Sequence, residues 1–234
     1  MLRVAGLQAF YGASQVLHGV DFEVAPGEIV ALLGRNGAGR TTTAKALMGM
    51  VETRGSARWN NRELVGLRPF EVARYGLGYV PESRDVFPSL SVEQNLRLGC
   101  KPRHAPGSLT AWVLEDVYRL FPILLQRRHT AAGVLSGGEQ QMLSLCRTLM
   151  GNPECLIVDE PAEGLAPQRV AELADLLRQV AMQGVAVLLI EQKLSVALAL
   201  AHRVLLMGRG RIVFSGSASA LRADEAVRRE WLEV

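Results

Sequence analysis

The segment EIVALLGRNGAGRTTTAKALM, residues 28–48, contains a strand signal, a glycine-rich loop and a helix signal in immediate succession. Its first part is a short apolar run typical of a buried strand, and a helix is predicted from Arg40 to about Met48. Between them, GRNGAGRTT (34–42) carries three glycines that let the backbone curl, so that N–H groups and the helix N-terminus face an anion. This order of elements predicts a phosphate-binding loop in an α/β protein.

One position of this loop departs from the usual pattern G-x-x-x-x-G-K-[ST], because Arg40 stands where lysine is expected. Thr41 is placed to ligate Mg²⁺, and Thr42 to contact phosphate. A plain glycine-rich turn is the alternative that the loop alone leaves open. The predicted nucleotide-binding residues of the loop are Gly34, Asn36, Gly37, Ala38, Gly39, Arg40, Thr41 and Thr42.

A second candidate segment is CLIVDE, residues 155–160, an apolar strand that ends in two acids about 120 residues after the loop. Asp159 would lie near the Mg²⁺ and its waters, and Glu160 would polarise an attacking water. Alone, such a run is more typical of a strand that reaches the surface. Following a phosphate-binding loop, it indicates the acid half of a nucleotide site.

A third segment, LSGGEQQ at residues 135–141, indicates an anion site at the start of a helix. Ser136 is predicted as an N-cap whose hydroxyl is free. Gly137 and Gly138 leave the first N–H groups of that helix uncovered, which suits an anion.

The rest of the chain alternates apolar strands with helices, which implies a largely parallel sheet. We expect one domain over 1–234, in which 1–87 and 131–234 form the core and about 88–130 forms an inserted helical lobe. Strands are predicted at 2–10, 16–24 (with Val20, Phe22 and Val24 on one face), 55–61, 77–80, 155–160, 185–192 and 203–216. Further helices are predicted at 68–76, 91–99 (capped by Ser91), 111–121, 137–151 and 167–184, with a polar loop at 101–108.

Composition narrows the class of protein. The chain of 234 residues is 49% hydrophobic and 21% charged with a formal net charge of +3, an ordinary globular balance that gives no indication of nucleic-acid binding. The three cysteines lack metal-site spacing, which fits a reducing cytosol. We find no apolar run of about 18 residues, so work at a membrane requires another subunit.

Together these segments resemble the ATP-binding subunits of ABC transporters over essentially the whole chain. The resemblance is strongest to the second of the two ATPases in branched-chain amino acid uptake systems, and the urea and short-chain amide uptake ATPases are close relatives. It implies a P-loop NTPase (RecA-like) core with an N-terminal antiparallel β subdomain and an inserted helical signature subdomain. The segments that carry it are LLGRNGAG, VPESRDVFPSLSVEQNL, LSGGEQQML, DEPAEGLAP and LLIEQ.

The resemblance assigns roles to three further residues. Tyr11 matches the aromatic residue that stacks on adenine. Glu82 matches the glutamine of the loop that senses the γ-phosphate, belongs to the metal set with Thr41 and Asp159, and contacts the transmembrane subunit. Gln192 replaces the switch histidine; it can position a phosphate or water but cannot shuttle a proton as imidazole does.

The resemblance also implies partners. Ser136, Gly137 and Gly138 would reach the γ-phosphate of ATP held by a second ATPase subunit, either a copy of this chain or a paralogue, in a head-to-tail dimer. Two transmembrane permease subunits would carry the solute, which a periplasmic solute-binding protein delivers. The chain would then sit peripherally at the cytoplasmic face of the inner membrane, with ATP and Mg²⁺ as its ligands.

Arg40 leaves two functions open. In the first, ATP hydrolysis assisted by Glu160 powers import. In the second, the chain binds nucleotide or acts as a scaffold and hydrolyses poorly, because a planar, longer arginine pushes the γ-phosphate off line or swings out of the cradle, at a cost of about 10² to 10³ in rate. A soluble ABC ATPase of repair or translation is less favoured, since those chains usually fuse two ATPase halves or carry coiled-coil insertions.

Overall fold

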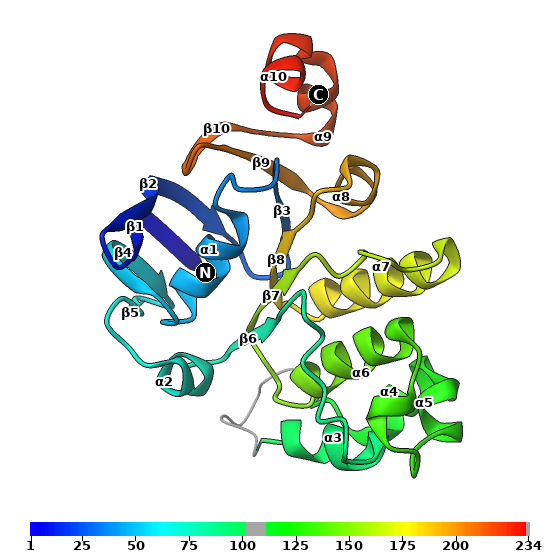
Figure 1. Ribbon diagram of the computed structural model, residues 1–234. Helices are drawn as coiled ribbons and strands as arrows, with labels where there is room; N and C mark the ends of the chain where they lie inside the picture. Colours follow the sequence, from blue (N-terminus) through cyan, green and yellow to red (C-terminus); the bar gives the residue numbers. More distant parts are fainter. Residues whose placement is uncertain (102–110, 233–234) are drawn as a thin grey trace.

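The computed structural model describes residues 1–101 and 111–232. Within them the strands form two sheets, one of order β2-β1-β4-β5 and one of order β10-β9-β3-β8-β7-β6 (Figure 1). The first sheet is antiparallel and comprises β1 (Leu2–Tyr11), β2 (Ser14–Val24), β4 (Glu52–Trp59) and β5 (Arg62–Glu63). The second comprises β3 (Ile29–Gly34), β6 (Leu77–Val80), β7 (Cys155–Asp159), β8 (Ala186–Ile190), β9 (Arg203–Gly208) and β10 (Arg211–Gly216).

The antiparallel sheet follows from alternation of apolar and polar residues along its strands. Val20, Phe22 and Val24 of β2 are all at most 6% exposed, so the predicted shared face is confirmed. Their apolar side faces β3 and α1 in a core that the two sheets share. The predicted N-terminal antiparallel unit is therefore present.

The second sheet is parallel except at its edge strand β10, which confirms the predicted largely parallel sheet. β3 pairs in parallel with β8 and β9, and β7 pairs in parallel with β8 and β6. All five residues of β7 are buried, as expected for a strand covered on both faces. Because these strands run the same way, the segments that follow β3, β6, β7 and β8 emerge at one edge of the sheet.

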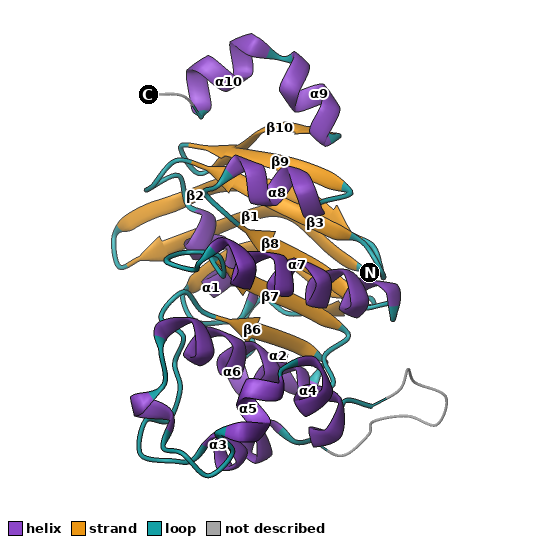
Figure 2. Cartoon of the chain, turned by 90° about the vertical axis from the view of Figure 1, so that its right-hand side faces the viewer, coloured by secondary structure: helices purple, strands orange, loops and turns teal. Residues whose placement is uncertain are grey.

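Helices pack on both sides of the parallel sheet (Figure 2). Leu156 and Val158 of β7 face the core formed with α6 and α7, while Cys155 and Ile157 face the core formed with α1 and the antiparallel sheet. The helices are α1 (Arg40–Leu47), α2 (Pro69–Arg74), α3 (Val92–Gly99), α4 (Leu114–Leu120), α5 (Pro122–Gln126), the short 3-10 helix η1 (Ala132–Val134), α6 (Gly137–Leu149), α7 (Pro167–Met182), α8 (Leu194–Leu200), α9 (Ala218–Ala223) and α10 (Glu225–Trp231). No helix within the described ranges is long and apolar enough to cross a bilayer.

Helices α3, α4 and α5 fall within 88–130; α3 and α5 pack against α6, and α4 packs against α5. The predicted cap is confirmed, because Ser91 accepts from the backbone N–H of Gln94 at 3.2 Å. The helix predicted from 111 begins only at Leu114, where the Asp116 carboxylate accepts from the N–H of Val113 and closes the first turn. The polar loop predicted at 101–108 lies, beyond Lys101, outside the described residues.

Candidate functional site

The loop 34–42 leaves β3 and enters α1 through a run of unusual backbone geometry. Gly34, Gly37 and Gly39 all have positive φ, at 154°, 80° and 108°. A Cβ at Gly34 would lie 2.5 Å from the carbonyl oxygen of Met207, and one at Gly39 would lie 2.9 Å from Leu17, so both positions require glycine. The loop therefore packs its glycines against β9 and β2 while its open side, at Gly37, remains uncovered.

A cleft of about 490 Å³ opens beside this loop at the edge of the parallel sheet where its strands end. Its lining brings together these predicted site residues: Asn36, Gly37, Gly39, Arg40, Thr41, Thr42, Glu82, Glu160 and Gln192. Val16 of β2 and Glu163 also line it, and sequence reasoning named neither. Val16 lies in a strand predicted only from its alternation, and Glu163 lies in DEPAEGLAP, where only Asp159 and Glu160 were assigned roles.

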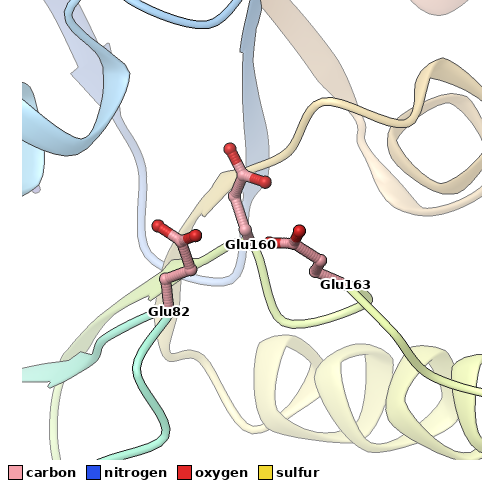
Figure 3. Close-up of side chains that lie close together, drawn as sticks. All are labelled: Glu82, Glu160 and Glu163. Carbon is pink, nitrogen blue, oxygen red and sulfur yellow. The ribbon is translucent and has the colours of Figure 1, made fainter.

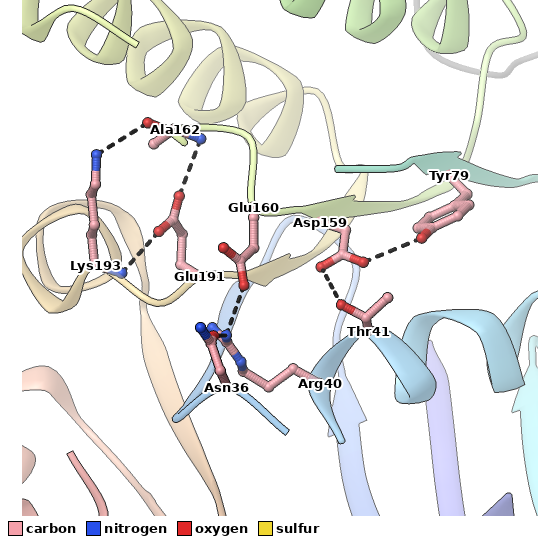
Figure 4. Close-up of polar contacts among 9 residues, drawn as sticks. All are labelled: Asn36, Arg40, Thr41, Tyr79, Asp159, Glu160, Ala162, Glu191 and Lys193. Atoms are coloured by element: carbon pink, nitrogen blue, oxygen red, sulfur yellow. Dashed lines mark hydrogen bonds and ion pairs between the residues drawn. The ribbon is translucent and has the colours of Figure 1, made fainter. Parts of the chain in front are cut away.

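Arg40 lies inside this cleft and contacts the predicted catalytic acid. Its residue is 5% exposed, and its Nη2 donates to Asn36 Oδ1 at 3.1 Å and to Glu160 Oε1 at 2.7 Å (Figure 4). Arg40 therefore lies inside the cradle, held there by the partly buried Glu160 carboxylate. Its Nη1 is buried and finds no partner among residues 1–101 and 111–232. An anion in the cleft would satisfy that nitrogen.

Asp159 and Thr41, two of the predicted metal ligands, are in contact. Asp159 is fully buried and accepts from Thr41 Oγ1 at 3.3 Å and from the hydroxyl of Tyr79 at 3.2 Å. Burial raises the pKa of the Asp159 carboxyl, and both hydrogen bonds oppose that rise. Burial, followed by the Asp159 charge, raises the pKa of Tyr79 well above its usual value, so the phenol remains a donor.

Tyr79 was missed as a site residue because it reads as part of the apolar strand LGYV. Its hydroxyl could have identified it, because a tyrosine hydroxyl on a buried strand must find a hydrogen-bond partner. Since β6 pairs with β7 in register Tyr79 to Ile157, the side chain lies one strand away from the acids that follow β7.

Glu82 and Glu160 meet Glu163 in a cluster whose carboxylate oxygens lie within 4.8 Å of one another (Figure 3). Burial, then the charges of Glu160 and Glu163, raise the pKa of Glu82. Burial also raises the pKa of Glu160, while the Arg40 guanidinium opposes it. Oxygen donors of this kind suit Mg²⁺, and Glu82 lies on the same edge of the sheet as the contacting pair Thr41 and Asp159.

The predicted signature residues lie away from this cleft, and their geometry corrects one expectation. The Ser136 hydroxyl is not free, because it donates to Glu139 Oε2 at 2.8 Å and accepts from the Glu139 N–H at 3.4 Å in a capping box. Gly137 is covered on one side by the Arg84 guanidinium, which would clash with any Cβ there. Neither these residues nor Gly138 line the cleft of their own chain.

Tyr11, Gly34 and Ala38 likewise do not line the cleft. Tyr11 ends β1 and is 46% exposed, and the nearby strand β2 presents Val16 to the cleft instead. Gly34 and Ala38 are buried behind the loop and shape its backbone.

Comparison with known proteins identifies the family. The family model described as ABC transporter matches residues 17–163, which include the loop, the acid pair and the segment at 135–141. The chain belongs to the ABC transporter family. Its relatives include the high-affinity branched-chain amino acid transport ATP-binding protein BraG of Pseudomonas aeruginosa, 40% identical over 99% of this chain and 99% of that protein.

Two further matches of this ABC family member span nearly the whole chain. The probable branched-chain amino acid transport ATP-binding protein LivF of Archaeoglobus fulgidus is 30% identical over 96% of this chain and 95% of its own. Among solved structures, an ATP-binding subunit of an ABC transporter is 28% identical with a TM-score of 0.78, and the match covers 98% of this chain and 92% of that one. The α/β architecture described above is thus the architecture of ABC ATPase cassettes.

Proposed function

We propose that this chain is the ATP-binding subunit of an ABC importer, which couples ATP binding and hydrolysis to the uptake of branched-chain amino acids. One observation carries the proposal: the phosphate-binding loop and Glu160 line one cleft at the ends of parallel strands, and Thr41 of that lining donates to the buried Asp159 behind it. The solute class rests on BraG and LivF, whose names specify branched-chain amino acid transport. Urea and short-chain amides remain the alternative solutes.

The cleft fits a nucleoside triphosphate with its metal. The N–H groups between Gly34 and Thr42 and the N-terminus of α1 offer donors for the phosphates, and the unpartnered Nη1 of Arg40 adds a charged donor. Thr41, Asp159 and Glu82 would hold Mg²⁺, which neutralises charge on the β- and γ-phosphates when it is bound. Tyr11 would stack on the adenine from the end of β1.

Glu160 is the residue we assign to the attacking water. Its carboxylate lines the cleft directly after β7, where it could accept a proton from a water beside the phosphates. Gln192, which also lines the cleft, would orient that water or the γ-phosphate through its amide.

A second candidate function follows from the ion pair between Arg40 and Glu160. While this 2.7 Å contact persists, one oxygen of Glu160 is occupied and the carboxylate is neutralised, so it is a poor proton acceptor. A nucleotide that draws Arg40 onto its phosphates would release Glu160, whereas one that leaves the pair intact would bind without turnover. If the pair stays intact, the chain would be a nucleotide-binding subunit with weak or no hydrolysis.

We further propose that Ser136, Gly137 and Gly138 serve a second ATPase subunit, since they lie outside their own chain's cleft. The partner would be a copy of this chain or a paralogue, arranged head to tail. Residues 1–87 and 131–234 would form the core, and the lobe at about 88–130, together with Glu82, would transmit motion to two permease subunits. The complex would lie at the cytoplasmic face of the inner membrane and receive solute from a periplasmic binding protein.

The test is reconstitution of the chain in proteoliposomes with the permeases, second ATPase and binding protein of a branched-chain amino acid uptake system from the same organism. We expect ATP-dependent uptake of labelled leucine, with ATPase activity stimulated by the loaded binding protein. Uptake of urea or acetamide in place of leucine would show that the solute is urea or a short-chain amide. ATP binding without either uptake or hydrolysis would favour the nucleotide-binding subunit instead.

A further inference from the structure

The residues on either side of Gln192 make contacts that its role in the cleft does not explain. Glu191 follows β8 and is only 2% exposed. A carboxylate this deeply buried needs donors, and it has two backbone N–H groups: that of Ala162 at 3.2 Å and that of Lys193 at 3.0 Å (Figure 4). One of its oxygens therefore fixes its own loop and the other fixes the turn that follows Glu160.

Lys193 completes the contact from the other side. Its Nζ donates to the carbonyl oxygen of Ala162 at 3.3 Å, so the two residues that flank Gln192 bind the backbone N–H and the backbone C=O of the same residue. Ala162 is fully buried, and its side chain carries no polar atom for either contact. The attachment is thus made to the backbone and sets the position of the turn itself.

That turn carries the predicted catalytic acid in an unusual conformation. Glu160 has φ of 44°, a left-handed value that a residue with a side chain adopts at some energetic cost. Its N–H donates to the carbonyl oxygen of Ile190 at 2.9 Å, and the N–H of Glu163 donates back to Glu160 O at 3.2 Å. The segments 160–163 and 190–193 are therefore joined by the bond from Glu160 to Ile190 and by the two contacts to Ala162.

We propose that Glu191 and Lys193 form a clasp on Ala162 that positions Glu160 and Gln192 as one unit. Both are positioning residues, because Gln192, Glu160 and Glu163 line the cleft and Glu191, Lys193 and Ala162 do not. The clasp holds the strained turn so that the Glu160 carboxylate and the Gln192 amide keep a fixed separation across the attacking water. This inference rests on the proposed ATPase function of the same site.

The first test compares Lys193→Met with Lys101→Met in the purified full-length chain. Lys193 is exposed, so its loss spares the core, and Lys101 makes the same kind of bond, from Nζ to the carbonyl oxygen of Ala73 at 3.2 Å, outside the cleft. We expect Lys193→Met to lower kcat about tenfold, and Lys101→Met to leave it within about twofold. Affinity for a fluorescent ATP analogue with Mg²⁺ should match wild type in both.

The second test compares Glu191→Gln with Glu63→Gln. Glu63 also accepts from two backbone N–H groups, those of Ala57 at 2.8 Å and Val65 at 3.2 Å, but in the antiparallel sheet. We expect Glu191→Gln to lower kcat about 10²-fold with little change in nucleotide affinity, the effect of misplacing a catalytic group by about 1 Å. Glu63→Gln should change the melting temperature and not kcat.

Amide hydrogen exchange supplies a readout that does not depend on turnover. The Ala162 N–H should exchange slowly in the wild-type chain and faster in both Glu191→Gln and Lys193→Met. A kcat that is unchanged in both variants, or that falls only in step with nucleotide affinity, would overturn the clasp. A wild-type chain that binds the analogue and never hydrolyses ATP would overturn the proposed function, while faster Ala162 exchange in the variants would still uphold the clasp.

Discussion

The guanidinium of Arg40 donates to the carboxylate of Glu160 at 2.7 Å, with only 5% and 12% of the two side chains exposed. The residue that departs from the loop's usual pattern thus contacts the residue expected to activate water. Because a buried ion pair is costly to break from one side, a triphosphate must compensate Arg40 before Glu160 is free. The rate of ATP hydrolysis should therefore depend on whether bound ATP separates Arg40 from Glu160.

Arg40→Lys is predicted to raise the turnover number about tenfold. A compact ammonium between the β- and γ-phosphates keeps the charge and no longer reaches Glu160 with a planar fork. The measurement is phosphate release at saturating Mg²⁺ and ATP. Arg35→Lys, an exposed position in the same loop, is the matched control and should leave the rate unchanged. Equal rates for Arg40→Lys and wild type would show that arginine is fully tolerated.

Glu160→Gln is predicted to abolish most hydrolysis, by about 10² to 10³, while ATP still binds. The amide is uncharged and cannot accept a proton from water, yet its oxygen can still accept from Arg40. Binding is followed with a fluorescent ATP analogue and turnover by phosphate release. The control is Glu172→Gln, which removes the negative charge that pairs with Arg169 at 2.6 Å on α7 and should leave turnover intact. Retained hydrolysis would remove Glu160 from its assigned role.

Tyr79→Phe is predicted to raise the Mg²⁺ concentration needed for half-maximal hydrolysis about tenfold. The phenol orients the Asp159 carboxylate, and partners of metal ligands typically matter at this scale. Tyr118→Phe is the matched control, because that hydroxyl is buried and has no hydrogen-bond partner within the part of the chain that the structure describes. An unchanged Mg²⁺ titration for Tyr79→Phe would show that Asp159 is oriented without it.

Glu139→Ala should lower stability by about 1 kcal/mol at neutral pH and by less in acid. Burial raises the Glu139 pKa, but hydrogen bonds from Ser136 and the charge of Arg127 outweigh it and hold the pKa below its usual value. Because the pKa of Glu139 is lower in the folded chain than in the unfolded chain, its charge stabilises the native state at pH values above the unfolded pKa. This stabilisation is lost as the pH falls through the pKa of the folded chain.

The matched control for this prediction is Gln94→Ala. Gln94 closes the capping box of α3 by accepting from the Ser91 N–H at 2.8 Å, and it has no charge to titrate. Urea unfolding between pH 3 and 7 should therefore show a stability loss that shrinks with acid for Glu139→Ala and stays constant for Gln94→Ala. A constant loss for both would mean that the Glu139 charge contributes nothing.

The fold and the outline of the site were accessible from the sequence because both depend on local pattern. Residues 28–48 specify strand, loop and helix by periodicity and glycine placement, and parallel strands must end at a common edge. That geometry alone brings Thr41 to Asp159. Helices α8, α9 and α10 were not predicted: they are as short as α2 and α4, but none has the proline at its start that marks α2.

What the sequence could not supply is the pairing of particular side chains. Arg40 meets Glu160 because the ends of β3 and β7 bring both side chains to one cleft, and no local pattern encodes the rotamers that join them. The Ser136 hydroxyl was expected to be free, although the residue three positions on is a glutamate, the signature of a capping box. Glu163 entered the cluster with Glu82 only because the strained turn at Glu160 redirects the chain.

The position of Ser136 outside its own chain's cleft leads to a mixing experiment. If the signature segment serves a second copy, then Glu160→Gln and Ser136→Arg chains are each inactive alone but regain activity when mixed. In a mixed dimer, the intact loop and Glu160 of one chain face the intact Ser136 of the other, so one of the two sites is complete.

An equimolar mixture should show about a quarter of the wild-type rate, because half of the dimers are mixed and each has one working site. If Ser136 served its own chain instead, no combination would rebuild a site, and the mixture would be no more active than its two components measured separately.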